Sequence, residues 1–214
     1  MKVLEIFAID FEGNAQKGVV EFGVVTLRGD LIEDPISDFC HIDRTNSIFF
    51  SRLLPLEKTE EKVPFFSHFH LFQSLRMRGI LAAHHSPVEE SFLRRLWPTA
   101  GPAIDWLKRE STTLCWGPWI DTLSLCRRHF PHWESFVLQT SVEHMGLERE
   151  VSALADGMCP PSRRRHHCAL FDSIACAVVL RKLLQSIPLS VEEALRQSLP
   201  AARRDRLRQS TLLL

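Results

Sequence analysis

Short apolar runs near the start of the chain predict β-strands. Residues 3–9 and 19–27 read VLEIFAI and VVEFGVVTL, and the turn-rich stretch GNAQKG separates them. We expect a third strand around residues 36–42, so that the three strands form an antiparallel meander. Residues 44–64 show no clear period, which indicates a loop with short helical pieces.

From about Phe65 onward, the pattern changes to helices that alternate with short strands. It predicts helices over residues 65–75, 87–97, 121–130, 136–145 and 167–184. It predicts strands at residues 79–84 and 113–123, and a loop at residues 150–165, which contain Pro and Arg. A meander followed by βα units predicts an α/β fold with a mixed sheet.

The end of the chain differs in character from the part before it. After Pro188, the segment SVEEALRQSL contains a capping box, in which Ser190 is followed three residues later by Glu193. The last residues are basic and then apolar. We therefore divide the chain into one domain, residues 1–186, and a helical, basic tail, residues 187–214.

Composition limits the class of protein. A chain of 214 residues with 45% hydrophobic content can bury one core. No stretch approaches the ~20 consecutive apolar residues of a membrane span, so we expect no membrane association. The N-terminus resembles a signal peptide only faintly, because Glu5 interrupts its apolar run and no small-residue cleavage site follows. We interpret it as a strand and expect a cytoplasmic protein.

The six cysteines show no C-x-x-C pairing, which indicates reduced thiols. A zinc site formed by Cys159, His166, His167 and Cys168 is an alternative, although adjacent ligands suit tetrahedral geometry poorly.

Charge is distributed unevenly along the chain, although the formal net charge is zero. Residues 1–75 contain 7 Lys/Arg and 12 Asp/Glu, whereas residues 76–214 contain 19 Lys/Arg and 14 Asp/Glu. The basic part is almost entirely arginine, which suits bidentate contacts with phosphate. This favours a nucleic-acid partner, while a solvated surface explains any single cluster equally well.

Four carboxylates fall on rows that should face the core. Strand parity places Asp10 and Glu12 on the face of Ile6 and Ala8. Helical spacing places two further acids on apolar stripes: Glu89 with Phe92, Leu93 and Leu96, and Asp172 with Ala175, Cys176 and Val179. For either helix alone, the position of the acid has an adequate structural explanation. A negative charge in the first turn interacts favourably with the helix dipole and stabilises the helix by roughly 0.3–1 kcal/mol.

All four acids together indicate a compensating cation, because charge on core-facing rows is otherwise costly. Ligands that are all oxygen favour magnesium or manganese over zinc. Two such ions about 4 Å apart can stabilise the attacking and leaving oxygens of a phosphodiester.

Three segments carry a resemblance to a known family. AIDFEG, AHHSPVEESFL and HHCALFD resemble the three motifs of the DEDDh family of 3′→5′ exonucleases, which adopts a ribonuclease H-like fold. VVEFGVV and WIDTLSLCRRHFP resemble the segments around them, so the resemblance spans about residues 3–184. It implies a mixed five-stranded sheet, an antiparallel meander followed by parallel βα units, flanked by helices.

The resemblance implies a catalytic role for five residues. Asp10 would bridge two divalent metal ions, Mg²⁺ or Mn²⁺, and Glu12 and Asp172 would hold the ion on the side of the nucleophile. Glu89 would lie near the second ion. His167 takes the position of the general base that accepts a proton from the attacking water, for which its unperturbed pKa of about 6.5 is suitable. A sibling subfamily uses Tyr one position later, but that residue is Cys168 here and the chain contains no Tyr.

Further positions would contact the substrate, and some depart from the family pattern. Phe11, Gly13, His85 and Arg165 are the expected substrate-binding residues. In the second motif, His85 stands where the family usually has Asn, and Glu89 stands where it usually has Asp. In the first motif, the family usually has Thr after the Glu, whereas this chain has Gly13-Asn14 after Glu12. These departures bear on substrate preference and rate more than on the type of reaction.

The function implied is a metal-dependent exonuclease that removes nucleotides from the 3′ ends of single-stranded DNA or RNA. Two alternatives remain: a catalytically weak nucleic-acid-binding or adaptor module on the same fold, and an oligoribonuclease-like phosphodiesterase acting on short RNA. A homodimer or a larger nucleic-acid-processing assembly is possible in each case.

Other histidines and aromatic residues favour structural interpretations. We expect His84 to make a structural hydrogen bond at a strand end, and His166 to be a loop residue beside the base. We expect the aromatic cluster to belong to the core and not to a base-stacking surface: Phe65, Phe66, Phe69 and Phe72.

Overall fold

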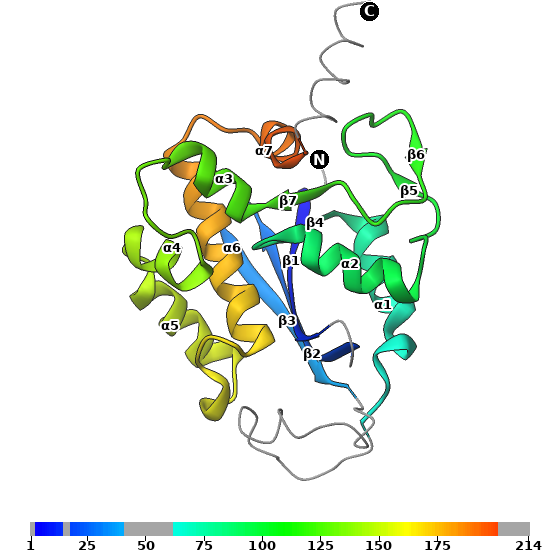
Figure 1. Cartoon of the computed structure of the whole chain (residues 1–214), viewed down its shortest axis with the longest axis horizontal. Coiled ribbons are helices and arrows are strands. Elements are labelled where there is room, and N and C mark those ends of the chain that lie inside the picture. The colour runs from blue at the N-terminus through cyan, green and yellow to red at the C-terminus, as the bar shows by residue number, and fades with distance from the viewer. Residues whose placement is uncertain (1–2, 15–17, 41–61, 201–214) are drawn as a thin grey trace, which may run out of the picture.

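The computed structural model describes residues 3–14, 18–40 and 62–200, so most of the expected loop at 44–64 lies outside the described residues. A five-stranded sheet with the order β3-β2-β1-β4-β7 forms its centre (Figure 1). The strands are β1 (Glu5–Asn14), β2 (Gly18–Arg28), β3 (Leu31–Phe39), β4 (Ile80–Ala83) and β7 (Trp119–Asp121). The first three pair antiparallel, and β1–β4 and β4–β7 pair parallel, which confirms the predicted mixed sheet.

Strand β3 begins five residues before the predicted strand at residues 36–42. Gly29 has a φ of 59° and forms a tight turn that brings Leu31 directly opposite Arg28. The strand contains Pro35 and several acids because it lies at the edge of the sheet, where such residues discourage further pairing. The pattern of apolar residues therefore did not predict the first half of β3.

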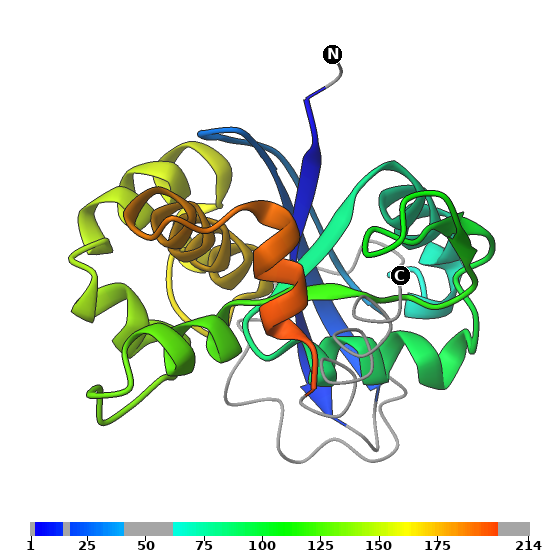
Figure 2. The ribbon, with the colours of Figure 1, turned by 90° about the horizontal axis from the view of Figure 1, so that it is seen from above.

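Helices surround the sheet in the part of the chain that the structure describes, together with the short 3₁₀ helices η3 (Phe65–His68) and η4 (Pro161–Arg163). They are α1 (Phe69–Arg78), α2 (Ser86–Leu96), α3 (Thr122–His129), α4 (Leu138–His144), α5 (Glu148–Met158), α6 (Ala169–Ser186) and α7 (Val191–Ser198). Seen from above, α4, α5 and α6 lie on one side of the sheet and α1 and α2 on the other (Figure 2).

Two predictions in the second half of the chain were wrong in part. Most of the predicted loop at residues 150–165 is helix α5, because Leu147, Val151 and Ala155 are spaced by four and are buried in the core. Of the strand predicted at 113–123, only β7 joins the main sheet, and Thr112–Thr113 (β6) pairs with Ala103–Ile104 (β5) instead. Pro118 directly precedes β7, and proline has no N–H to donate to the ladder between β7 and β4.

The core divides into two clusters because successive side chains of β1 point to opposite faces. Ile6 and Ala8 belong to the cluster that contains most of α6, whereas Phe7, Ile9 and Phe11 belong to the cluster that contains Phe65 and Phe72. Phe65 and Phe72 are buried as expected, but Phe66 is 62% exposed and does not belong to the core.

Helix α7 packs against β7 and α3. Its N-cap, Ser190, accepts a hydrogen bond from the Glu193 N–H at 3.2 Å, as the capping box predicts. Leu195 is buried in the same core cluster as α6. The division of the chain after residue 186 remains a prediction.

All six cysteines are free, and five of them are buried. Within the described ranges, no single helix is long and apolar enough to cross a membrane; α6 and α7 reach that length and composition only as a pair, bent by 114°.

Candidate active site

Asp10 and Glu12 lie near the C-terminal end of β1 and are both partly exposed, whereas residues 5–9 before them are buried. They continue the face of Ile6 and Ala8, which is the face that α6 covers. Between them, the Phe11 side chain points the other way and packs edge-on against Phe65 at 5.2 Å between ring centroids. Both acids therefore project from the central strand towards the N-terminal end of α6.

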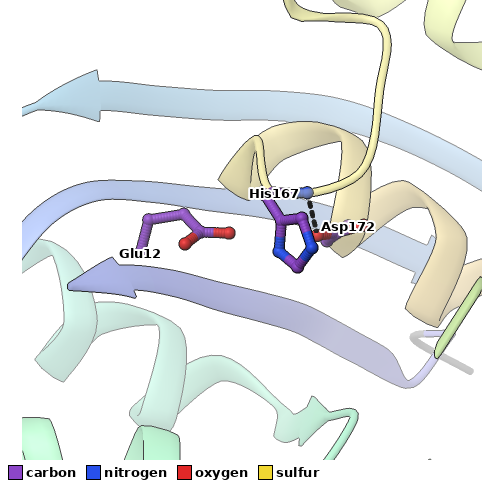
Figure 3. Close-up of side chains that lie close together, drawn as sticks. All are labelled: Glu12, His167 and Asp172. Atoms are coloured by element: carbon purple, nitrogen blue, oxygen red, sulfur yellow. Dashed lines mark hydrogen bonds between the residues drawn. The ribbon is translucent and has the colours of Figure 1, made fainter. Parts of the chain in front are cut away.

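Asp172 lies in the first turn of α6 and is buried. One carboxylate oxygen accepts the backbone N–H of His167 at 2.9 Å, and the other lies 2.6 Å from Nδ1 of His166. A carboxylate oxygen of Glu12, a ring nitrogen of His167 and a carboxylate oxygen of Asp172 all lie within 4.8 Å of one another (Figure 3). The structure thus brings together the first and third motifs, which are about 160 residues apart.

Glu89 lies in the first turn of α2 and is 5% exposed. It accepts a hydrogen bond from the backbone N–H of Phe11, which ties α2 to the end of β1. Its Oε2 is buried and has no hydrogen-bond partner among the described residues. Leu93 is buried below it, as the stripe predicts, but Leu96 is 46% exposed because α2 ends there.

Burial and repulsion between neighbouring acids raise the pKa of three carboxylates, those of Asp10, Glu12 and Glu89. The pKa of Asp10 is raised well above its ordinary value by burial, then by Glu89, Asp172 and Glu12. Burial raises the pKa of Glu12 to about 7, with a further contribution from Asp172, while His167 opposes the shift. Burial and then Glu12 raise the pKa of Glu89 to about 8. A cation among these acids would lower their pKa values and favour the ionised forms.

A divalent cation fits this donor set. The oxygens of Asp10, Glu12, Glu89 and Asp172 are hard ligands of the kind that Mg²⁺ and Mn²⁺ prefer. The unpartnered Oε2 of Glu89 is a buried acceptor that an ion would satisfy. By contrast, no ligand cluster includes Cys159 and Cys168 within the part of the chain that the structure describes, so the alternative zinc site is not supported.

The predicted substrate residues have different surroundings. Phe11 contributes its backbone to the site, while its ring belongs to the core. Gly13 lies at a register shift of the β1–β2 hairpin, where a Cβ would come within 2.2 Å of the Gly18 carbonyl oxygen. His85 is exposed with a φ of 84°, and its N–H donates to Asp121. Arg165 is exposed.

The three consecutive arginines before the histidines do not form one surface. Arg163 is buried in an ion pair with Glu21, and Arg164 pairs with Asp156. A phosphate contact therefore remains an expectation for Arg165 alone. His84 makes structural hydrogen bonds, as expected, at 2.8 Å to Thr122 Oγ1 and at 2.8 Å to the Phe136 carbonyl oxygen.

Four residues of the site were not identified from the sequence as parts of it. His166 contacts Asp172, Asp121 accepts the His85 N–H, and Glu21 and Arg163 pair beside Glu12. Glu21 was detectable in principle, because a single acid inside the apolar run VVEFGVV requires a buried partner. Nothing local in the sequence indicates which of the chain's arginines that partner is.

The sheet order, the meander followed by parallel βα units and the flanking helices define a ribonuclease H-like α/β fold. The solved structures that are similar to the chain include the following two. Exonuclease X in complex with 5′ overhanging duplex DNA gives a TM-score of 0.59 at 23% identity, over 91% of this chain and 99% of that one. A full-length 3′-exonuclease gives a TM-score of 0.59 at 19% identity, over 87% of this chain and 62% of that one. No protein-family model and no curated protein matches the sequence.

Proposed function

We propose that this protein is a metal-dependent 3′→5′ exonuclease of the DEDDh type. The observation that carries the proposal is the convergence of Glu12, His167 and Asp172 within 4.8 Å. Asp10 and Glu89, whose pKa values are raised by burial and by the neighbouring carboxylates, complete the set. The similar solved structures are an exonuclease with bound duplex DNA and a 3′-exonuclease, which is consistent with this reaction class.

Four carboxylates would hold two divalent ions, Mg²⁺ or Mn²⁺: Asp10, Glu12, Glu89 and Asp172. The ions would supply Lewis acidity and neutralise charge on the phosphodiester. His167 accepts a proton from the attacking water, and its exposed ring leaves room for substrate beside Glu12. His166 holds the Asp172 carboxylate through Nδ1.

The substrate in this proposal is the 3′ end of single-stranded DNA or RNA. The backbone of Phe11 and Gly13 lies next to the acids and would face the terminal nucleotide. His85 and Arg165 are exposed beside Asp121 and His167 and would contact phosphate. The enzyme would act in the cytoplasm, alone, as a homodimer or in a larger nucleic-acid-processing assembly.

The test is degradation of 5′-labelled single-stranded DNA and RNA with Mg²⁺ or Mn²⁺. We expect a ladder of products shortened by one nucleotide at a time, which EDTA abolishes. Asp10→Asn should lower the rate on the order of 10²-fold or more, because it removes charge stabilisation at the reacting phosphate. Asp30→Asn is the matched control, since Asp30 is exposed in the turn between β2 and β3, away from the acids.

Two outcomes would replace the proposal. Tight binding of both nucleic acids without any ladder would favour the binding or adaptor module. A ladder confined to very short RNA would favour the oligoribonuclease-like phosphodiesterase.

A further inference from the structure

Glu21 on β2 is a buried carboxylate that the proposed reaction does not use. It lies directly opposite Glu12 in the antiparallel pairing of β1 and β2, so both side chains project from the same face. Glu21 is 3% exposed. Like charges directly opposite each other are destabilising, so this position requires a cation.

That cation is Arg163, in the segment between α5 and α6. Its guanidinium pairs with the Glu21 carboxylate and is almost fully buried. Its Cζ lies 4.7 Å from the centroid of the Phe39 ring on β3. Arg163 is therefore fixed to the sheet at two points, and its charge is directed into the protein.

Glu21 also binds the start of α6. It accepts a hydrogen bond from the backbone N–H of Ala169, the first residue of that helix. Strand and helix touch here, since a Cβ on Gly23 would lie 2.4 Å from the Ala169 carbonyl carbon. One carboxylate thus holds both ends of the segment 163–169, which carries His166 and His167.

His167 needs such support. Its φ of 64° lies in the left-handed region, which residues other than glycine rarely adopt. A residue keeps this conformation only where its surroundings impose it. The imidazole is also exposed, so side-chain packing contributes little to its position.

We propose that Glu21 and Arg163 form a positioning pair that holds His167 in place relative to Glu12. The inference rests on the proposed exonuclease function. The pair acts through the segment 163–169 and does not contact the substrate.

The variant that tests this is the double substitution Glu21→Gln with Arg163→Met. Removing one partner alone would leave a buried, unpaired charge, whereas replacing both is often neutral for stability. Gln keeps an acceptor for the Ala169 N–H, and Met has a length similar to the arginine stem. Arg164→Met is the matched control, because Arg164 pairs with Asp156 at the surface.

We expect the double variant to unfold near the wild-type temperature and to retain its KM within about twofold, while kcat falls about 10–100-fold. In a His167→Ala background, the same double change should lower the residual kcat less than about twofold, because the residue that it positions is gone. The Arg164→Met variant should keep the wild-type kcat. An unchanged kcat in the folded double variant, or an equal loss in both backgrounds, would overturn the proposal.

A second measurement does not depend on activity. The ¹H–¹⁵N signals of the His167 imidazole in metal-free protein should shift in the double variant and not in Arg164→Met. Unshifted signals would overturn the positioning role. Wild-type protein without nuclease activity would instead refute the proposed function, and the imidazole signals would still decide whether the pair positions His167.

Discussion

At the scale of single residues, two adjacent histidines differ in what they contact. The His166 ring lies against the Phe171 ring and contacts Asp172 through Nδ1. The His167 ring instead faces the space between Glu12 and Asp172, and only its backbone N–H bonds to Asp172 (Figure 3). Neighbouring side chains therefore differ in their contacts: the His166 ring contacts the Asp172 carboxylate, whereas the His167 ring lies between Glu12 and Asp172.

Replacement of His167 by alanine should lower kcat on the order of 10²–10⁴-fold, the usual contribution of a general base. Metal affinity should stay close to that of wild type, because four carboxylates remain. Steady-state kinetics and titration with Mn²⁺ check both parts. A large loss of Mn²⁺ affinity would show that the imidazole is a metal ligand and not the base.

Replacement of His166 by alanine should have the opposite effect. It frees the Asp172 carboxylate, and loss of a group that orients a metal ligand typically weakens metal affinity 10–100-fold. At saturating metal, kcat should recover to within a few-fold of wild type. An activity that stays low at every metal concentration would indicate that His166 takes part in the reaction.

At the scale of elements, α7 supports the edge of the sheet nearest α2. Ser198 accepts the backbone N–H of Asp121 at 2.8 Å. Asp121 caps α3 through the Ser124 N–H, and it also accepts the N–H of His85, which precedes α2. The C-terminal helix is thus connected through one aspartate to the segment that presents Glu89.

Leu195→Ala should lower the free energy of unfolding by about 2–5 kcal/mol, the range for truncating a buried leucine. Leu195 is 1% exposed in the core cluster of α6, so the loss should appear in a single cooperative transition. Chemical denaturation followed by circular dichroism measures it. Arg196→Ala is the control, because Arg196 is exposed and its pair with Glu192 is worth about 0.5 kcal/mol or less. A separate, early transition for α7 would mean that residues 187–200 fold as an independent appendage.

At the scale of the whole molecule, the acid cluster couples stability to pH and to metal. The pKa values of Glu12 and Glu89 rise from 4.5 to about 7 and about 8 in the folded state. Between pH 4.5 and about pH 8, the folded protein therefore binds more protons than the unfolded chain does. The resulting stabilisation is complete below pH 4.5 and is lost as the pH rises through about 7 and 8.

We expect the unfolding temperature of the metal-free protein to fall between about pH 5.5 and 8.5, by about 2–4 °C for each kcal/mol lost in a domain of this size. Added Mg²⁺ should reverse most of this fall, because binding to the folded state alone stabilises it. Glu89→Gln removes one of the titrating groups and should flatten the profile. Differential scanning calorimetry in EDTA and in Mg²⁺ provides the measurement. A flat wild-type profile in EDTA would contradict the raised pKa values of these buried acids.

The amino-acid sequence by itself determined what depends on local periods. Alternation along a strand placed Asp10 and Glu12 on the face of Ile6 and Ala8, and the structure agrees. Helical spacing placed Asp172 and Glu89 in first turns, facing inward, where both are buried. These patterns were predictable because backbone geometry fixes where each side chain points within an element.

Only the tertiary structure decided which distant residues meet. Arg163 pairs with Glu21, 142 positions away, and no period along the chain relates the two. The first half of β3 was missed because its position at the edge of the sheet outweighed its local composition. His166 faces Asp172 because the segment before α6 folds back on the first turn of that helix. Such contacts depend on how loops bring elements together, and local sequence patterns do not encode that information.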